Sequence, residues 1–139
     1  MRDLKKMLQD RYGLEPNDQG EYLNDTITVL LGRRVCRAFE DRELDPKLLN
    51  LLLACAQSAP TKSNLQQYSI IVVKNKAKQK AIADLIPSMP WIADAPVFLA
   101  FLGDVSRNRK LAELRGRDYA NNNVDTFMNA AVDAALAMQ

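Results

Sequence analysis

Two short apolar runs, residues 68–73 and 95–102, are the segments of this chain with the composition of buried β-strands. A proline stands near the start of the second run, where it does least harm to a strand. Most of the remaining patterned sequence has the period of helices. Because two strands alone make a sheet of marginal stability, we expect further strands from residues outside this sequence or from a second chain. The sequence therefore predicts an α+β fold that is incomplete within these 139 residues.

Helices are predicted from apolar spacing and from the residues that begin and end them. Asn24 or Asp25 begins one helix, which Gly32 ends, and Asp45 followed by Pro46 has the pattern of a helix N-cap and first position. The expected helices cover residues 2–10, 25–31, 46 onward, 76–86, 106–115 and 125 onward, with breaks after the first at Gly13, Pro16, Asn17 and Gly20. The leucine-rich third helix is apolar on most faces, so we expect it to be buried.

The last helix is rich in alanine on nearly every side and reaches the final residue, Gln139, without a glycine or asparagine cap. Small residues let another element pack close, and they cannot all be buried inside so small a monomer. We therefore expect this helix to form a symmetric homodimer. The uncapped end favours a fragment of a longer protein, so residues 1–139 are predicted to be the N-terminal portion of a single domain.

Composition removes several classes of function. The chain has no histidine, which excludes Ser-His and Cys-His pairs, histidine bases and most zinc sites. Cys36 and Cys55 are too few for a disulfide scaffold and are predicted to be buried thiols. The net charge of +2 does not indicate a general polyanion binder. No apolar run reaches the roughly 18 residues of a membrane span, and no signal peptide is evident, so we expect a cytoplasmic protein that does not bind a membrane.

Three arginines, Arg33, Arg34 and Arg37, follow the helix that Gly32 ends. The planar guanidinium group suits phosphate oxygens, which it can bind through two parallel hydrogen bonds. A solvated turn whose arginines pair with Glu40 and the acidic residues after it explains the cluster as well, and the cluster alone favours that explanation.

Residues 60–66 form a polar connection after the leucine-rich helix. Thr61, Ser63, Asn64 and Gln66 could hydrogen-bond the carbonyls and nitrogens of a heteroaromatic ring. An ordinary helix–strand connection has the same composition and is favoured by this segment taken alone. The direction of Lys62, toward a ligand or toward solvent, stays open.

Two further features have simpler explanations. Trp91, after Met89 and Pro90, could line a ring pocket but is better explained as part of the core. The alternating lysines of residues 74–80 resemble a nucleic-acid stripe, but no aromatic residues are interleaved with them. We therefore predict a solvated helix face.

Taken in order, these segments resemble the FMN-dependent nitroreductase family. Residues 33–39, Arg-Arg-Val-Cys-Arg-Ala-Phe, resemble its Arg-Arg-Ser-x-Arg-x-Phe opening, and residues 59–66, Ala-Pro-Thr-Lys-Ser-Asn-Leu-Gln, resemble its Ala-Pro-Ser-x-x-Asn-x-Gln loop. Residues 90–99 and 111–116 are similar to the NADPH-preferring branch that includes flavin reductases. The resemblance covers about residues 26–139. It implies helices around a small antiparallel sheet, and an obligate dimer with FMN in its interface.

The resemblance also implies roles for individual residues. In the family the arginines of the first motif bind the FMN phosphate, which gives this role to Arg33, Arg34 and Arg37, with the backbone of Val35 beside them. Val35 stands where the family usually has serine.

The second motif reaches the isoalloxazine ring, so Thr61, Ser63 and Asn64 are the ring-binding candidates. Met89 stands where this branch often has a flavin-contacting glutamine. Asn129 and Asp133, four residues apart on the last helix, are left with three possible places: an interface, the neighbourhood of the flavin, or a solvated edge.

The function implied is an FMN-dependent NAD(P)H oxidoreductase that reduces nitroaromatics, quinones or flavins, with no side-chain catalyst because the cofactor carries the chemistry. The family's chain continues past the alanine-rich helix, so little or no turnover, and weak FMN binding or none, are expected from these 139 residues alone. The first alternative is a non-enzymatic flavin-binding or helical dimerisation module. The second is a small nucleic-acid binder that uses the arginines and the lysine helix.

Overall fold

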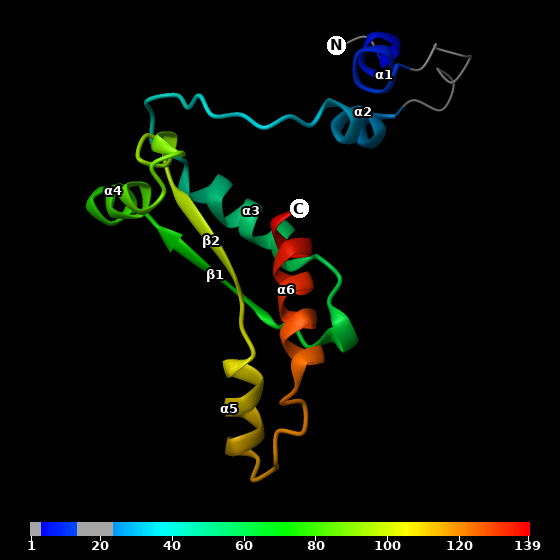
Figure 1. Ribbon diagram of the computed structural model, residues 1–139, viewed down its shortest axis with the longest axis vertical. Helices are drawn as coiled ribbons and strands as arrows, with labels where there is room; N and C mark the ends of the chain where they lie inside the picture. Colours follow the sequence, from blue (N-terminus) through cyan, green and yellow to red (C-terminus); the bar gives the residue numbers. More distant parts are fainter. Residues whose placement is uncertain (1–3, 14–23) are drawn as a thin grey trace. The chain divides into compact units, whose positions relative to one another are not determined.

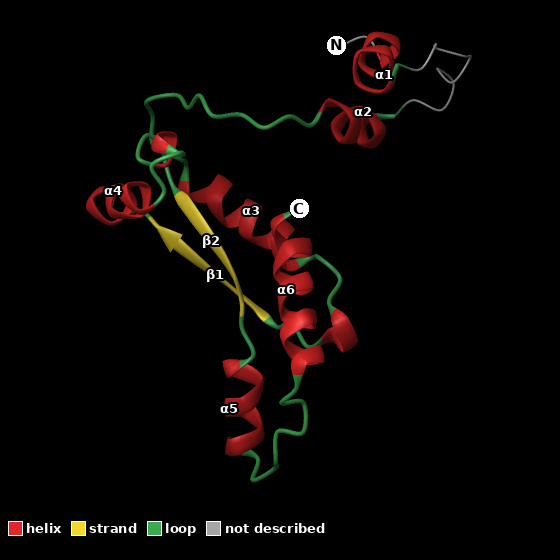
Figure 2. Cartoon of the chain, in the orientation of Figure 1, coloured by secondary structure: helices red, strands yellow, loops and turns green. Residues whose placement is uncertain are grey.

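The computed structural model describes residues 4–13 and 24–139. The chain divides into two compact units, Met1–Arg37 and Ala38–Gln139, and each is described by itself. Figure 1 labels the elements along the chain, and Figure 2 separates helices from strands. The predicted chain breaks at Pro16, Asn17 and Gly20 lie outside the described residues, as does the predicted start of the first helix.

The first unit contains two helices, α1 (Leu4–Tyr12) and α2 (Asp25–Gly32). Gly13 follows α1 with φ of 63°, and its N–H donates back to a carbonyl in the helix at 2.9 Å. Asn24 begins α2 because its side-chain oxygen accepts a backbone N–H at 3.0 Å. The guanidinium of Arg11 donates at 3.0 Å to a carbonyl in the last turn of α2, which links the two helices.

The second unit contains four helices, two 3₁₀ turns and two strands. In chain order these are α3 (Pro46–Gln57), η2 (Lys62–Asn64), β1 (Tyr68–Val73), α4 (Lys76–Leu85), η3 (Pro90–Ile92), β2 (Phe98–Gly103), α5 (Ser106–Leu114) and α6 (Val124–Met138). The side chains of Asp45, Asn75 and Asn123 accept backbone N–H groups at the starts of α3, α4 and α6, at 2.8–3.0 Å. The helices therefore begin where short polar side chains satisfy their first free amides.

Strands β1 and β2 pair antiparallel, with Tyr68 opposite Gly103 and Val73 opposite Phe98. The two predicted strands are confirmed, and with them the α+β class and the small antiparallel sheet. Strand β2 begins later than predicted, at Phe98, after a segment that contains Pro96. Proline has no N–H to donate to the ladder, so regular pairing begins beyond it.

Helix α6 lies along the sheet, with α3 on the same side (Figure 1). Its buried alanines pack with Tyr68 in the core, where Ile70 and Phe101 are partly buried beside them. At Gly103 the approach is close enough that a Cβ there would lie 3.2 Å from the backbone of Ala130. The small residues predicted to allow close packing therefore serve contact between this helix and β2.

Two burial predictions from the sequence are wrong for the described chain. Helix α3 buries only Leu49, while Leu51 is 60% exposed, because α3 has more apolar faces than its neighbours in this chain cover. Cys36 and Cys55 are both exposed. Cys36 lies in an irregular segment and Cys55 on an uncovered side of α3, so neither has the packed surroundings that the prediction assumed.

In the part of the chain that the structure describes, no helix combines the length and the apolarity needed to cross a bilayer.

The contact between β2 and α6 can be tested by adding volume at Gly103. We expect Gly103→Val to lower the free energy of unfolding by about 1–3 kcal/mol, because the valine overpacks against helix backbone that cannot move aside. Urea unfolding followed by circular dichroism measures the change. Leu102→Val is the matched control, since Leu102 is 43% exposed and its side chain points to the other face of the sheet. An equal effect of both substitutions would contradict the close approach.

Candidate functional site

The connection from α3 to β1 has an unusual backbone. Ser63, Asn64 and Gln66 have φ of 53°, 55° and 48°, in the left-handed region. Residues other than glycine are uncommon there, and the cost is roughly 1–3 kcal/mol for each residue that the surroundings must impose. Asparagine tolerates this region better than most residues, whereas serine and glutamine gain no such relief. Other contacts must therefore fix the loop in this shape.

Bonds inside the loop supply the first of these contacts. The N–H of Asn64 donates to the Thr61 carbonyl at 3.2 Å, and that of Leu65 donates to the Lys62 carbonyl at 3.1 Å. The Thr61 hydroxyl oxygen accepts the N–H of Gln66 at 3.2 Å. These bonds close the loop on itself.

Helix α5 supplies the second set of contacts. The Asn108 side-chain amide donates to the Leu65 carbonyl at 3.0 Å, and the Arg107 guanidinium donates to the Gln66 carbonyl. Two neighbouring carbonyls of the loop are thus bound by side chains from one end of a helix that lies about forty residues further along the chain.

Helix α6 supplies the third contact, through Asp133. This side chain is 0% exposed. One carboxylate oxygen accepts the N–H of Lys62 at 2.9 Å, and the other accepts the N–H of Gln67 at 3.1 Å. The carboxylate therefore joins the first and last parts of the loop.

The loop leaves two of the three predicted ring-binding side chains free to reach a ligand. Ser63 and Asn64 are exposed, and within residues 4–13 and 24–139 neither side chain hydrogen-bonds another residue. Thr61 is half-buried and uses its oxygen inside the loop. The structure thus brings Thr61, Ser63 and Asn64 together on one fixed turn with a free hydroxyl and a free amide, which can bind both donors and acceptors of a planar ring.

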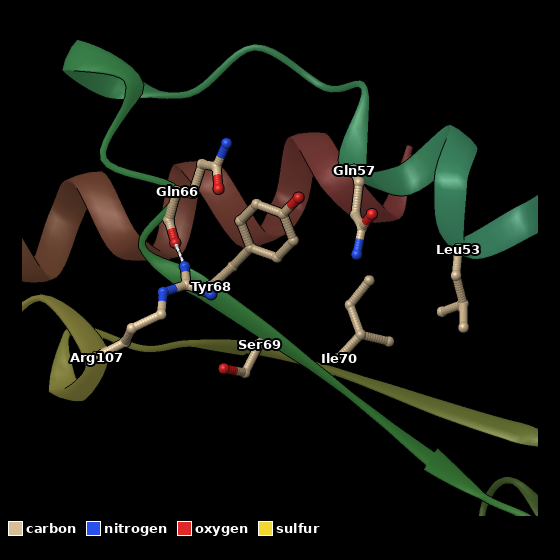
Figure 3. Close-up of a pocket in the computed structure, with 7 residues that line it drawn as sticks. All are labelled: Leu53, Gln57, Gln66, Tyr68, Ser69, Ile70 and Arg107. Carbon is tan, nitrogen blue, oxygen red and sulfur yellow. Dashed lines mark hydrogen bonds between the residues drawn. The ribbon is translucent and has the colours of Figure 1, made fainter. Parts of the chain in front are cut away.

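A pocket of about 520 Å³ lies beside this loop (Figure 3). Helix α3, strand β1 and helix α5 all contribute to it, and its lining residues are Leu53, Gln57, Gln66, Tyr68, Ser69, Ile70 and Arg107. Gln66 belongs to both the loop and the pocket. The sequence pointed to Gln66 through its motif. Arg107 lay in the helix predicted for residues 106–115, and no local signal set it apart.

Asp104, just after β2, is hydrogen-bonded to Ser69, one of the residues that line this pocket. One of its oxygens accepts the N–H and the hydroxyl of Ser106, at 2.8 and 2.5 Å, and the other accepts the hydroxyl of Ser69. The hydrogen bond from the Ser106 hydroxyl, followed by that from Ser69, lowers the pKa of the Asp104 carboxyl below its ordinary value. The backbone N–H of Asp104 donates to Gln67 at 2.9 Å, so this cluster also fixes the start of β1.

The three predicted phosphate-binding arginines lie in the first unit, in an exposed segment after α2. The guanidinium of Arg34 donates to the Leu31 carbonyl at 3.0 Å and to the carbonyl of Arg33 at 2.7 Å, so it caps the end of α2. Part of the Arg34 guanidinium is therefore already hydrogen-bonded within the chain. Glu40, which the sequence offered as a partner for these arginines, forms an ion pair with Arg42 at 2.6 Å.

The other two residues predicted to bind the cofactor, Val35 and Met89, are both well exposed. Val35 is 81% exposed in the segment between the arginines. Met89 is 42% exposed and precedes η3 in the second unit. Their roles as ligand contacts stay predictions.

Comparison with known proteins places this geometry in a family. The profile of the nitroreductase family matches residues 30–139. Among curated proteins, FMN reductase (NADPH) from Bacillus subtilis is 34% identical over 119 residues, which are 84% of this chain and 48% of that protein. Among solved structures, NfrA1 nitroreductase from B. subtilis has a TM-score of 0.79 at 34% identity, covering 83% of this chain and 47% of that one.

A second solved structure, NfrA2 of B. megaterium, has a TM-score of 0.80 at 30% identity and covers 84% of this chain and 48% of its own. The chain belongs to the nitroreductase family, which confirms the resemblance that its motifs predicted. It spans about half the length of the curated relatives that it matches.

The lowered pKa of Asp104 predicts a pH-dependent contribution to stability. Because the folded pKa lies below the ordinary value of 3.8, the ionised carboxylate stabilises the fold above that pH, and the contribution is lost as the pH falls through the folded pKa. We expect Asp104→Asn to be less stable than the unmodified chain at about pH 7, with a difference that shrinks in acid. Urea unfolding at several pH values measures it.

Asp118→Asn serves as the control, since Asp118 is an exposed residue away from this cluster. A difference for Asp104→Asn that stayed constant from neutral to acid pH would show that charge plays no part.

Proposed function

We propose that this chain binds FMN and is part of a flavin-dependent NAD(P)H oxidoreductase. The observation that carries the proposal is the fixed loop at residues 61–66, whose motif matches the family and whose Ser63 and Asn64 side chains are exposed. Two of its relatives support the choice of cofactors, since they are an NADPH-dependent and an NAD(P)H-dependent FMN reductase.

The loop has the donors and acceptors that a flavin ring needs. The ring carries carbonyl oxygens and nitrogens along one edge, and a hydroxyl and a carboxamide on a rigid turn can bind them in one orientation. We assign ring contacts to Ser63 and Asn64, with Thr61 fixing the turn and Met89 offering an apolar contact. When bound, FMN supplies the hydride chemistry, accepting from NAD(P)H and passing electrons to an acceptor such as a nitroaromatic, a quinone or a free flavin.

We assign the phosphate to Arg33, Arg34 and Arg37, with the backbone of Val35, on the motif match. The Arg34 guanidinium already caps α2, so it has fewer N–H groups left for a phosphate. Arg33 and Arg37 are therefore the side chains to test.

We expect Arg33→Ala or Arg37→Ala to weaken FMN binding by tenfold or more, because a charge-assisted hydrogen bond contributes about 1.5–3 kcal/mol. Riboflavin, which lacks the phosphate, should bind both variants about as well as it binds the unmodified chain. Quenching of flavin fluorescence measures both affinities, with titrations extended to high protein concentration.

Arg42→Ala is the matched control, since Arg42 pairs with Glu40 outside the motif and should leave both affinities unchanged. Equal losses for FMN and riboflavin would show that the arginines act through the fold. If the folded chain bound neither flavin, the proposed function would be wrong for these residues.

The same sample tests the expectation of low turnover. NADPH consumption with excess FMN and a nitroaromatic should stay near the rate given by free FMN alone. A rate of about 1 per second or more above that background would show that these 139 residues already form a working site.

We also propose that the chain forms a homodimer through the exposed face of α6. The buried face of this helix is occupied by the chain itself, through Ala130, Ala134 and Ala137. Beside this buried face lies an exposed apolar stripe, in which Phe127 is 71% and Met138 65% exposed. A continuous apolar helix face of this kind is typical of an interaction surface, and a two-fold partner is the commonest that a chain finds.

Ala131 lies on this exposed face, whereas Ala134 belongs to the core. We expect Ala131→Glu to convert a dimer into a monomer, because the charge would be buried against an apolar partner. Light scattering at micromolar concentration measures the mass. Leu114→Glu on α5 is the control, since Leu114 is 73% exposed and outside the stripe. A monomeric unmodified chain would contradict the proposal.

A further inference from the structure

Asp133 is a buried carboxylate with an unusual set of partners. It is 0% exposed, and among the described residues no lysine or arginine forms an ion pair with it. Removing a carboxylate from water is costly unless hydrogen bonds replace the lost solvation. The hydrogen bonds to Asp133 come from two backbone amides, those of Lys62 and Gln67. Within the part of the chain that the structure describes, its hydrogen bonds therefore come from the loop and not from its own helix.

The conformation of the loop also depends on Asp133. The two amides lie at the two ends of the segment that contains all three left-handed residues, Ser63, Asn64 and Gln66. A single rigid group that accepts from both ends fixes the distance between them, so the intervening residues must take the compact path that the structure shows. The loop's own bonds and the α5 side chains engage other groups of this segment. These are the carbonyls of Leu65 and Gln66 and the N–H groups of Asn64, Leu65 and Gln66.

We propose that Asp133 is the positioning residue of the flavin site: its carboxylate fixes the shape of the 61–66 loop, and that shape orients Ser63 and Asn64 toward the ring. The inference rests on the proposed function, because it concerns how the same loop recognises a flavin. Asp133 does not touch the flavin in this scheme; it acts through the two amides that it binds. Its substitution should therefore affect recognition of the ring and leave recognition of the phosphate unchanged.

The geometry requires a carboxylate at this position. Each oxygen accepts one N–H, so both must be acceptors. Asparagine has nearly the same size and shape, but one of its two terminal groups is a donor. In Asp133→Asn an NH₂ group would face a backbone N–H, and one end of the loop would be released while the packing of α6 on the sheet is kept.

The test compares Asp133→Asn with Asp125→Asn, a carboxylate-to-amide change on the same helix at an exposed residue that accepts from Asn129. We expect Asp133→Asn to weaken FMN and riboflavin by the same factor, about fivefold to a hundredfold, as follows from leaving a buried N–H without an acceptor. Asp125→Asn should bind both flavins as the unmodified chain does. The equal loss for both ligands separates this effect from that of the arginines, which is specific to FMN.

Amide hydrogen exchange by NMR gives a readout that does not depend on flavin. In Asp133→Asn the amides of Lys62 and Gln67 should exchange faster, while the paired amides of β1 and β2 keep their protection. Faster exchange throughout the sheet would show a general role in the fold and overturn the inference. If Asp133→Asn does not fold, Asp133→Glu takes its place: it keeps both acceptors but displaces them by one methylene, and it should weaken both flavins equally in a folded chain.

The outcomes separate the two proposals. Flavin affinities of Asp133→Asn equal to those of the unmodified chain would overturn the inference and leave the proposed function standing. Failure of the unmodified chain to bind either flavin would overturn the proposed function, and the inference with it.

Discussion

The packing of helix α6 on the two-stranded sheet is the contact on which the second unit depends. Two antiparallel strands do not make a stable sheet in water unless another element covers one of their faces. Helix α6 provides this cover with alanines, and opposite Ala130 the sheet has Gly103. Backbone therefore lies almost directly on backbone, and the stabilisation comes from many close contacts between small groups.

The same helix also determines the shape of the loop, so core and candidate site share one element. Alanines on one face of α6 set its position over β1 and β2, and that position carries Asp133 to the amides of the connection that leads into β1. A shift of α6 along the sheet would move the carboxylate and the loop with it. The packing of α6 in the core therefore fixes the conformation of the loop.

Local features of the structure were predictable from the sequence. Both strands, the end of α2 at Gly32 and the start of α3 at Asp45 and Pro46 depend on neighbouring residues, and the structure confirms them. Burial was harder to predict, because it depends on what covers a surface. The leucines of α3 and the two cysteines looked buried by residue type, and in the described chain most of them are exposed.

The contacts that shape the site join residues far apart in the chain. Spacing alone left Asp133 with three possible places, and the structure removes the solvated edge, because the side chain is fully buried. Its two partners lie 71 and 66 positions earlier in the sequence, beyond the reach of any periodicity. The motifs did identify Thr61, Ser63 and Asn64 as one group, and the structure places them on one turn. The ligand contacts of these residues and of the arginines stay predictions.

The left-handed backbone of the loop bears on how far this protein could be stabilised. Glycine adopts positive φ without the steric cost that serine and glutamine bear, so replacing Ser63 or Gln66 with glycine would relieve strain in the folded chain. At residue 63 the same change would delete the hydroxyl assigned to the ring. Selection for thermal stability and selection for ligand recognition would therefore favour different residues at this position, which makes the loop a place where a more robust variant is expected to be a poorer binder.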